Sequence, residues 1–362
     1  MKACSYCGHD NENEATRCRK CGTAFPSTPA AVPVPGPEEP IPAPQFIDLS
    51  RLEGVFDFRD GFSRPDWKLI DAAIQSLEGA DDRREAWGEV ALQWLEKLRG
   101  ELGGSYHLTV SRRCALLSAL DSPAANRLLD YCETATAAIR EALRGVAWES
   151  FDGPQVIIAF AEEDDYYQYV SGFCSDGEHP TSGGVHIRRG YSHVALPFET
   201  ELHSGQTIVH ELTHHCLTHL PIPVWLNEGV AQHLQKTIVG ARLVCDDLAE
   251  RHFGFWNQER IQGFWAGTSF HEPGDSVQLS YNLAEILVHL LIEKGGDFLA
   301  FLRFAHANDG GQTASWDCLG CCLGETVGAF LGPGDWRPQR KAIKACWKAA
   351  HEEGEKSEDR VV

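Results

Sequence analysis

Three histidines and one glutamate are concentrated in the segment TIVHELTHHC, which runs from Thr207 to Cys216. Within it, His210, Glu211 and His214 have the spacing HExxH. Residues four positions apart lie about 40° apart around a helix, so both imidazoles face one side and reach one metal ion. Glu211 lies beside that face, where a carboxylate acts as a general base on water. The pattern therefore predicts a metal-dependent hydrolytic site, with a solvated polar helix face as the alternative.

A third metal ligand is expected from Glu228, which follows His214 by fourteen residues in the segment VWLNEGVAQHL. The prolines of the intervening PIPV segment end a first helix, expected at 205–219, and a second helix is expected from about Trp225. The second helix then folds back towards the first. Two histidines and one glutamate leave the fourth position of a tetrahedral zinc to water, whose pKa falls to near 7.

The combination HELTHHCL and LPIPVWLNEGVAQHL resembles the gluzincin metallopeptidases of the peptidase MA-like group. The preceding strands and hairpin and the later SYNLAEILVHLLIEKGG also resemble that family, over residues 105–305. The resemblance implies a zincin-like fold and hydrolysis of peptide bonds. It also implies one catalytic Zn²⁺, with His210, His214 and Glu228 as its ligands and Glu211 as the base that activates water.

The resemblance further suggests Tyr281 as the hydrogen-bond donor to the tetrahedral oxyanion, a role that needs a positioned donor. His271 is the rival donor, and an ordinary aromatic at the start of a helix is the alternative reading of Tyr281. The sequence departs from the family four residues after the glutamate ligand. Many relatives carry an acid there, but this chain has Gln232. Its amide oxygen still accepts a hydrogen bond from a ligand imidazole, without charge, so Gln232 is the candidate outer-shell residue.

The remaining histidines near this segment are expected to lie outside the ligand set. Segment 183–196 is expected to form a hairpin. The resemblance implies that this hairpin supplies the edge strand that pairs with an extended peptide. Its residues His186, Arg188 and His193 are expected to be exposed rather than catalytic. His215 and His219 share the ligand face poorly and are expected at the surface or next to the ligands.

Two CxxC pairs, each followed by glycine, lie within residues 1–25 as CSYCG and CRKCG. Two such knuckles form a closed tetrahedral site, and so short a unit cannot fold on a hydrophobic core alone. Metal binding then contributes roughly 10–16 kcal/mol to folding. The unit resembles the short zinc ribbons at the N-termini of many bacterial proteins, and a structural Zn²⁺ is expected on Cys4, Cys7, Cys18 and Cys21. Such a closed site is a docking or regulatory module and performs no chemistry.

The other cysteines are expected to be buried or free thiols. The segment CLGCC at 318–322 contains a further CxxC, and Cys346 or His306 could complete a second metal site with it. No second knuckle follows, so thiols are the preferred reading. Cys216 is expected to face the core.

The elements that must position these residues indicate an α+β fold. Strands are expected at 106–110 and 154–160, and a strongly apolar helix at 281–295. The expected organisation is a zinc ribbon at 1–25, a Pro-rich linker at 26–45, a zincin-like metallopeptidase domain at 46–350 and a charged tail at 351–362. That domain is expected to comprise a helical lead-in at 46–104, a sheet with the HExxH helix at 105–220, and a mainly helical part at 221–350.

Composition narrows the classes of partner. The chain has 362 residues, 43% of them apolar, a net charge of −20 and a pI of about 5.2. A negative field repels nucleic acid and anionic lipid, so neither is an expected partner. The chain contains no run of 18 apolar residues, so no membrane span is expected. The N-terminal segment MKACSYCGHDNENEA has no apolar stretch, so no secretory signal is expected. Thirteen cysteines without a disulfide framework fit a reducing compartment, so a cytoplasmic location is expected.

The leading functional hypothesis is a zinc metallopeptidase acting on a peptide or protein substrate. The alternative is a catalytically weak or inactive zincin-fold scaffold that binds a protein partner through the ribbon and the Pro-rich linker. A third reading, a nucleic-acid-associated regulator, conflicts with the net charge. The sequence leaves substrate specificity and oligomeric state open.

Overall fold

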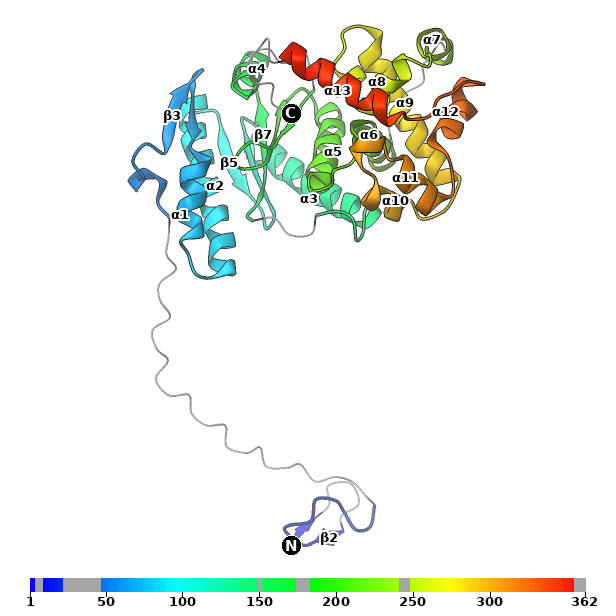
Figure 1. Ribbon diagram of the computed structural model, residues 1–362. Coiled ribbons are helices and arrows are strands. Elements are labelled where there is room, and N and C mark those ends of the chain that lie inside the picture. The colour runs from blue at the N-terminus through cyan, green and yellow to red at the C-terminus, as the bar shows by residue number, and fades with distance from the viewer. Residues whose placement is uncertain (4–8, 22–46, 149–151, 174–182, 241–247, 355–362) are drawn as a thin grey trace. The chain divides into compact units, whose positions relative to one another are not determined.

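The computed structural model describes residues 1–3, 9–21, 47–148, 152–173, 183–240 and 248–354 (Figure 1). The chain divides into two compact units, Met1–Gln45 and Phe46–Val362. Cys4, Cys7, the Pro-rich linker at 26–45 and the tail beyond residue 354 lie outside the described residues. In the first unit, β1 (Lys2–Ala3) pairs with β2 (Asp10–Asn11) as an antiparallel ladder.

The second unit is built on a mixed sheet with the strand order β5-β6-β7-β9-β8. The central pairs β6–β7 and β7–β9 are parallel, whereas the outer pairs β5–β6 and β8–β9 are antiparallel. The continuous apolar run of β7 is buried along its whole length, as expected for a central strand covered on both faces. The strands are β5 (His107–Val110), β6 (Cys114–Ser118), β7 (Gln155–Phe160), β8 (Val185–Ile187) and β9 (His193–Pro197).

Alternate residues of the central strands pack into two separate cores. Leu116, Ile157 and Val194 point to the core that contains the long helices of the C-terminal half. Their neighbours in the same strands, such as Leu117 and Ile158, point to the core on the other face. Successive side chains of a strand alternate between faces, so the sheet separates the two cores.

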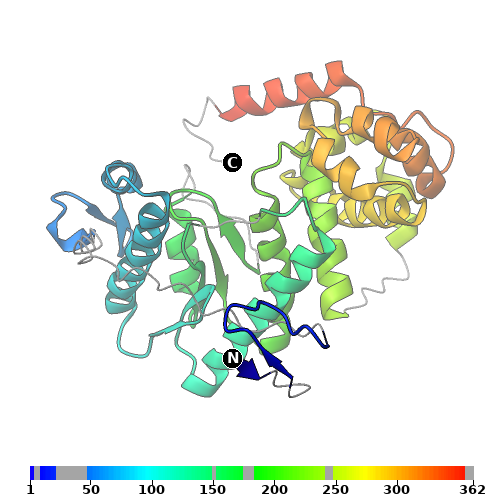
Figure 2. The ribbon, with the colours of Figure 1, turned by 90° about the horizontal axis from the view of Figure 1, so that it is seen from below.

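Helices cover both faces of this sheet (Figures 1 and 2). On one face, two helices of the N-terminal half pack together with α4, and a small hairpin of two strands contacts the longer of them. On the other face, α3 and the HExxH helix α5 cover the sheet, and the helices of the C-terminal half pack against α5. The α-helices are α1 (Trp67–Gln75), α2 (Ala80–Leu102), α3 (Ser122–Ala142), α4 (Glu163–Ser171), α5 (Glu201–Leu217), α6 (Val224–Val239), α7 (Leu248–Phe255), α8 (Arg260–Ala266), α9 (Asp275–Glu293), α10 (Phe298–Phe304), α11 (Gln312–Ala314), α12 (Leu323–Leu331) and α13 (Arg340–Gly354). The small hairpin pairs β3 (Phe56–Arg59) with β4 (Phe62–Pro65). The short turns are η1 (Leu49–Arg51), η2 (Thr268–Phe270), η3 (Ala307–Asp309) and η4 (Ser315–Leu319).

Local sequence signals explain several helix ends. Asp66 caps α1 by accepting from the backbone N–H groups of Lys68 and Leu69. Asp121 caps α3 in the same way through Ala124 N, and a proline stands in its first turn. These are the residues that helix starts favour, because a side-chain oxygen satisfies N–H groups that have no partner in the helix.

The α+β class expected from the sequence is confirmed, with three differences in detail. Strand β6 was not expected, because its apolar run CALLS is short and lacks alternation. The lead-in at 46–104 includes the β3–β4 hairpin and is therefore not wholly helical. Helix α9 begins at Asp275, so Tyr281 lies in its second turn and not at its start. Within the described residues, no helix has the length and apolar character needed to cross a bilayer.

Candidate metal centre

Two helices contribute the candidate metal ligands. His210 and His214 lie on α5, whose N-cap Thr200 accepts from the His203 backbone N–H at 3.2 Å. Glu228 lies in the second turn of α6, which begins after Pro223. Because the proline-containing segment turns the chain between them, α6 packs back along α5, as expected from the sequence.

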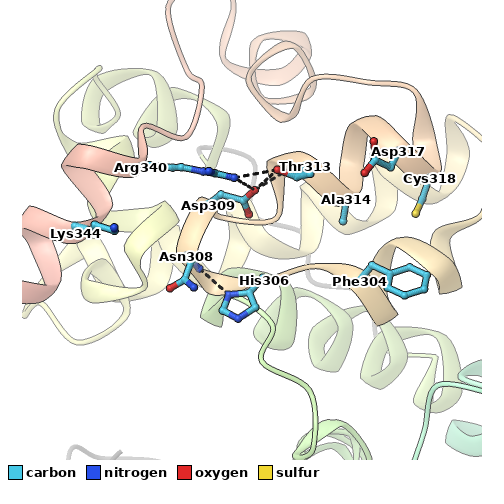
Figure 3. A pocket seen from close by; sticks show the side chains of 10 residues that line it. All are labelled: Phe304, His306, Asn308, Asp309, Thr313, Ala314, Asp317, Cys318, Arg340 and Lys344. Atoms are coloured by element: carbon cyan, nitrogen blue, oxygen red, sulfur yellow. Dashed lines mark hydrogen bonds and ion pairs between the residues drawn. The ribbon is translucent and has the colours of Figure 1, made fainter.

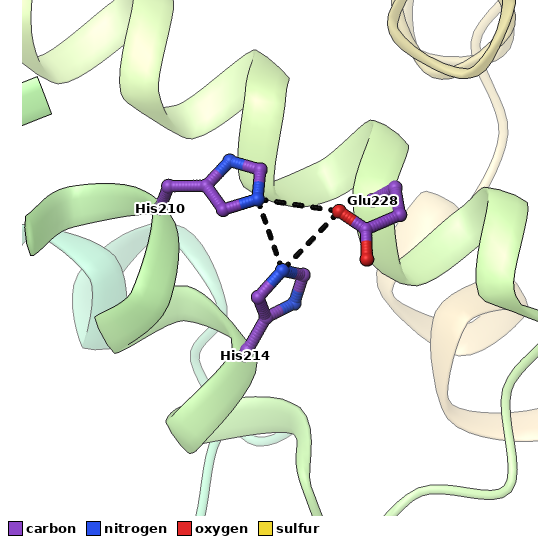
Figure 4. Close-up of side chains that lie close together, drawn as sticks. All are labelled: His210, His214 and Glu228. Carbon is purple, nitrogen blue, oxygen red and sulfur yellow. Dashed lines mark hydrogen bonds and ion pairs between the residues drawn. The ribbon is translucent and has the colours of Figure 1, made fainter. Parts of the chain in front are cut away.

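The three ligand atoms form a compact triangle (Figure 4). His210 Nε2 lies 3.2 Å from Glu228 Oε2, His214 Nε2 lies 3.3 Å from the same oxygen, and the two nitrogens are 3.0 Å apart. The solvent-exposed fraction of the side chain is 12% for His210, 13% for His214 and 14% for Glu228. The site is therefore recessed but still open to solvent. Within the described residues, no other group of three His, Cys, Asp or Glu side chains converges in this way.

The chemistry and spacing of these donors fit zinc. Atoms at about 2.0–2.1 Å from a tetrahedral zinc lie about 3.3 Å from one another, close to the three separations here. Two imidazoles and one carboxylate form a typical donor set for catalytic zinc, with a fourth position left for water or substrate. The ring planes of His210 and His214 are nearly perpendicular, at 87°, so their nitrogens meet at one point without stacking.

The local electrostatics favour a cation at this point. Burial by itself lowers the pKa of His214, but the charge of Glu228 and its hydrogen bond outweigh burial and raise the pKa to about 9. Burial likewise raises the pKa of Glu228, whereas the two histidines lower it well below its usual range. The protein therefore stabilises positive charge between these side chains.

The proposed catalytic side chains lie next to the ligands. Glu211 is only 8% exposed, and its charge contributes to the raised pKa values of both His214 and Tyr281. The Tyr281 ring lies 6.4 Å from the His210 ring, centroid to centroid, and packs edge-on against Phe270. Burial, followed by the charges of Glu228 and Glu211, raises the pKa of the Tyr281 hydroxyl, so it stays protonated. His271, the rival donor, is exposed.

The structure places the side chain of Asn227 next to the candidate ligand His214, whereas the role of Gln232 stays a prediction. The Asn227 side chain adds to the raised pKa of His214. Asn227 Oδ1 and His214 Nδ1 are both buried, and neither has a partner within standard hydrogen-bond limits among the described residues. The two groups therefore lie close together but slightly outside that geometry. No described hydrogen bond joins Gln232 to either ligand histidine. Asn227 directly precedes the candidate ligand Glu228 in the sequence. This position, the first residue of NEG, was the only feature of the sequence that could have indicated its place beside the ligands.

The expectation that the hairpin histidines are exposed was wrong. The His193 side chain is only 2% exposed. Its Nε2 is hydrogen-bonded to the Tyr169 hydroxyl at 2.8 Å, and its Nδ1 lies 2.7 Å from the Tyr191 carbonyl oxygen. Burial lowers the pKa of His193 to about 4, so it is a neutral core residue. The strand alternation sends this side chain into the core on the face of α1 and α2.

His186 and His215 are also more buried than expected, and they contact each other. His215 is 5% exposed, and its ring lies 5.0 Å from that of His186, centroid to centroid. Burial lowers the pKa of His215 to about 4 and that of His186 well below its usual value, so both imidazoles are neutral. His219 is exposed and packs edge-on against Trp148.

The CLGCC segment does not form a second metal site within the described residues. Cys321 faces the Ser315 hydroxyl, and Cys322 faces Gln312. Cys318 and His306 instead line an open hollow of about 550 Å³, where Arg340 pairs with Asp309 at 3.2 Å (Figure 3). Cys216, as expected, is fully buried in the core.

Two of the four cysteines of the predicted zinc ribbon, Cys18 and Cys21, lie within the described residues. Cys18 is 3% exposed, and its sulfur accepts from Asn11 Nδ2 at 3.5 Å. Burial raises the pKa of its thiol, but the backbone N–H groups of Cys21 and Lys20, and then Asn11, lower it to about 6. Amide donors around a sulfur stabilise the thiolate, which is the form that binds zinc.

Comparison with known proteins adds no assignment. No protein-family model matches the chain, and no curated protein has a significant match to its sequence.

Proposed function

We propose that the chain is a zinc-dependent metallopeptidase of the gluzincin type. The convergence of His210, His214 and Glu228 on one point, with Glu211 and Tyr281 beside it, carries this proposal. His210, His214 and Glu228 would hold the zinc. When bound, zinc supplies a Lewis acid that polarises the peptide carbonyl and lowers the pKa of water.

Glu211 acts as the general base and then as the acid. Its carboxylate accepts a proton from the attacking water while the water oxygen bonds to the carbonyl carbon. As the C–N bond breaks, the same carboxyl group returns the proton to the leaving nitrogen. Its low exposure favours this role because bulk water does not compete for the proton.

Tyr281 donates a hydrogen bond to the carbonyl oxygen as negative charge develops there. Its raised pKa keeps the hydroxyl protonated, as a donor requires. The substrate is an extended peptide that pairs with β8. This strand forms one edge of the sheet and has no strand neighbour on its outer side among the described residues.

The N-terminal unit with its four cysteines would hold a second, structural zinc and act as a docking module. The lowered pKa of Cys18 and the adjacent Cys21 thiol support half of this site. The nine described cysteines are all free thiols, which supports a reducing compartment, and we infer that the proposed activity is cytoplasmic.

The test compares wild type with Glu211→Ala in a peptide-library digest, with zinc chelation as a control. Both proteins are expected to bind about two zinc ions, because Glu211 is not a ligand. Hydrolysis is expected to fall by about 10²–10⁴-fold in the variant, the usual contribution of a general base. Full activity in Glu211→Ala would contradict the mechanism.

One observation favours a second candidate, a zincin-fold scaffold that binds a partner and catalyses weakly or not at all. The acceptor beside His214 is the neutral amide of Asn227, slightly outside hydrogen-bond geometry, whereas the outer-shell acceptor of a catalytic zinc is often a carboxylate. Residues 1–45 would then bind the partner. Capture of a partner by these residues, with no turnover of any library peptide by the full chain, would favour the scaffold.

A further inference from the structure

A cluster of three polar side chains joins the edge strand to the helix that carries the metal ligands. We call His186, Ser192 and His215 the bridging cluster. Ser192 Oγ lies 2.7 Å from His186 Nε2 and 3.0 Å from His215 Nδ1, and the two ring nitrogens are 3.0 Å apart. The rings meet edge to face at 86°. None of the three side chains belongs to the metal-ligand set.

The bridging cluster lies in the middle of a row of contacts between β8 and α5. Before it, Gly184 lies so close to α5 that an added Cβ would come within 2.4 Å of Thr207 Cγ2. After it, Arg188 Nη2 donates to the Thr218 carbonyl at 2.9 Å. The row therefore follows α5 from one turn before His210 to the end of the helix.

The serine hydroxyl is the central member of the bridging cluster. A neutral imidazole carries one N–H donor and one acceptor nitrogen, so a hydroxyl between two of them accepts from one and donates to the other. Either direction gives each of the three polar groups a partner. Hydrogen bonds are directional, so the cluster holds the strand at a defined distance and angle from the helix more strictly than apolar contact does.

This placement concerns the proposed active site because His215 directly follows His214 in the helix. His186 is the central residue of β8, and its backbone pairs with Val194 of β9 on the inner side. A peptide added at the outer side of β8 would be aligned by the strand backbone. The distance from that peptide to His210 and His214 is then set by how β8 lies on α5.

We propose that the bridging cluster is a positioning device that sets β8 relative to α5, so that an extended peptide paired with β8 places its scissile carbonyl at the metal ligands. This inference rests on the proposed peptidase function. The three residues touch neither metal nor substrate in this role. They act through the strand and the helix.

The first experiment measures kcat and KM for the octapeptide that is cleaved best in the library digest. Ser192→Ala removes the central hydroxyl without adding volume. It is expected to lower kcat about tenfold and change KM less than about twofold, because the peptide still pairs with β8 but its scissile carbonyl is displaced from the metal ligands. His186→Leu is expected to lower kcat similarly. His186→Gln places an amide near the position of Nε2 and is expected to restore kcat to within about threefold of wild type.

The second experiment needs no activity. Hydrogen–deuterium exchange is measured on the full chain for wild type and Ser192→Ala, together with bound zinc. Exchange at residues 185–187 is expected to rise about tenfold, with no change at 155–160 and no loss of zinc. If wild type cleaves no peptide, the proposed function fails, but this exchange result still tests the positioning role. Unchanged exchange at 185–187, or loss of zinc in Ser192→Ala, would overturn the inference.

Discussion

At the scale of single residues, the site combines groups whose charges and protonation states depend on one another. Glu228 raises the pKa of His214, the two ligand histidines lower that of Glu228, and Glu228 and Glu211 both raise that of Tyr281. The acids thus favour a cation between the ligands and, in addition to burial, keep the tyrosine protonated as a hydrogen-bond donor. The candidate ligand His214 and the proposed oxyanion donor therefore both respond to the same two carboxylates.

Tyr281→Phe tests the oxyanion donor. Removing the hydroxyl is expected to lower kcat by about 10²–10³-fold while leaving bound zinc unchanged, because the hydrogen bond forms mainly in the transition state. Steady-state kinetics and metal analysis measure both. Tyr131→Phe is the matched control. The Tyr131 hydroxyl donates to the Gly205 carbonyl of α5, the helix that carries His210 and His214, at 3.0 Å but lies outside the proposed catalytic set. An equal loss of kcat in both variants would show that the effect is structural.

His193 predicts how stability depends on pH. Its pKa is about 4 in the folded chain and about 6.5 when unfolded, so below pH 6.5 the unfolded chain binds a proton that the folded chain does not. The contribution of His193 to stability is therefore complete above pH 6.5 and falls by about 2 kcal/mol between pH 6.5 and pH 5. Urea unfolding measures the fall in the free energy of unfolding between these two pH values. In His193→Gln this fall is expected to be smaller than in wild type by about 2 kcal/mol.

Tyr169→Phe is the control for this pH effect. It removes the hydroxyl that contacts His193 Nε2 but leaves the imidazole buried among the same rings. Its free energy of unfolding is expected to fall at both pH values by about 1 kcal/mol, with the pH dependence retained. A pH dependence unchanged in His193→Gln would show that this imidazole is not held neutral in the core.

At the scale of elements, the site depends on how closely α6 and α9 pack. Glu228 is on α6 and Tyr281 on α9, and Gly229 lies between the two helices. A Cβ at Gly229 would come within 2.5 Å of the Ala284 carbonyl oxygen and 2.7 Å of Val288 Cγ2. The absence of a side chain there allows the backbones to approach, so the glycine of NEG has a packing role as well as its place beside the ligand.

Gly229→Ala is expected to destabilise the chain by about 1–3 kcal/mol, because a backbone carbonyl cannot move aside as a flexible side chain can. Urea unfolding measures this change. Gly100→Ala in α2 is the matched control, since an added Cβ meets nothing within 4 Å, and it is expected to stabilise by about 0.5–1 kcal/mol. Wild-type stability in Gly229→Ala would contradict the close contact between α6 and α9.

At the scale of the whole molecule, the two units are expected to be thermodynamically independent. Among the described residues, both large hydrophobic cores are made of residues after position 46, within the second unit. A chain of residues 46–362 is therefore expected to unfold with a midpoint within about 2 °C of the full chain, since it keeps both of these cores whole. It is also expected to keep its hydrolytic activity and to bind one zinc ion instead of two.

Calorimetry and metal analysis of the truncated chain check this expectation. Cys18→Ser in the full chain is the matched control, because it removes one thiolate and leaves every residue of the second unit unchanged. It is expected to lose the same zinc ion and to leave the main unfolding transition in place. A large drop in the unfolding midpoint of the truncated chain would show that the first unit stabilises the second.

The features that the sequence alone determined are local ones. The 3.6-residue period of a helix brings His210 and His214 to one face whatever surrounds them. The prolines before α6 likewise end one helix and permit the next. The long apolar run of β7 and the hairpin turn at Gly190, with φ of 71°, were also readable from a few neighbouring residues.

Only the tertiary structure decided which distant side chains meet. It brings one oxygen of Glu228 to 3.2 and 3.3 Å from two imidazoles, and it brings Asn227 close to His214. It also packs His186, which the sequence suggested was exposed, edge to face against His215. Such distances depend on how whole apolar faces of β8, α5, α6 and α9 pack, which is a sum over many weak contacts. No short segment of sequence encodes that sum, whereas the period of a single helix is encoded within one turn.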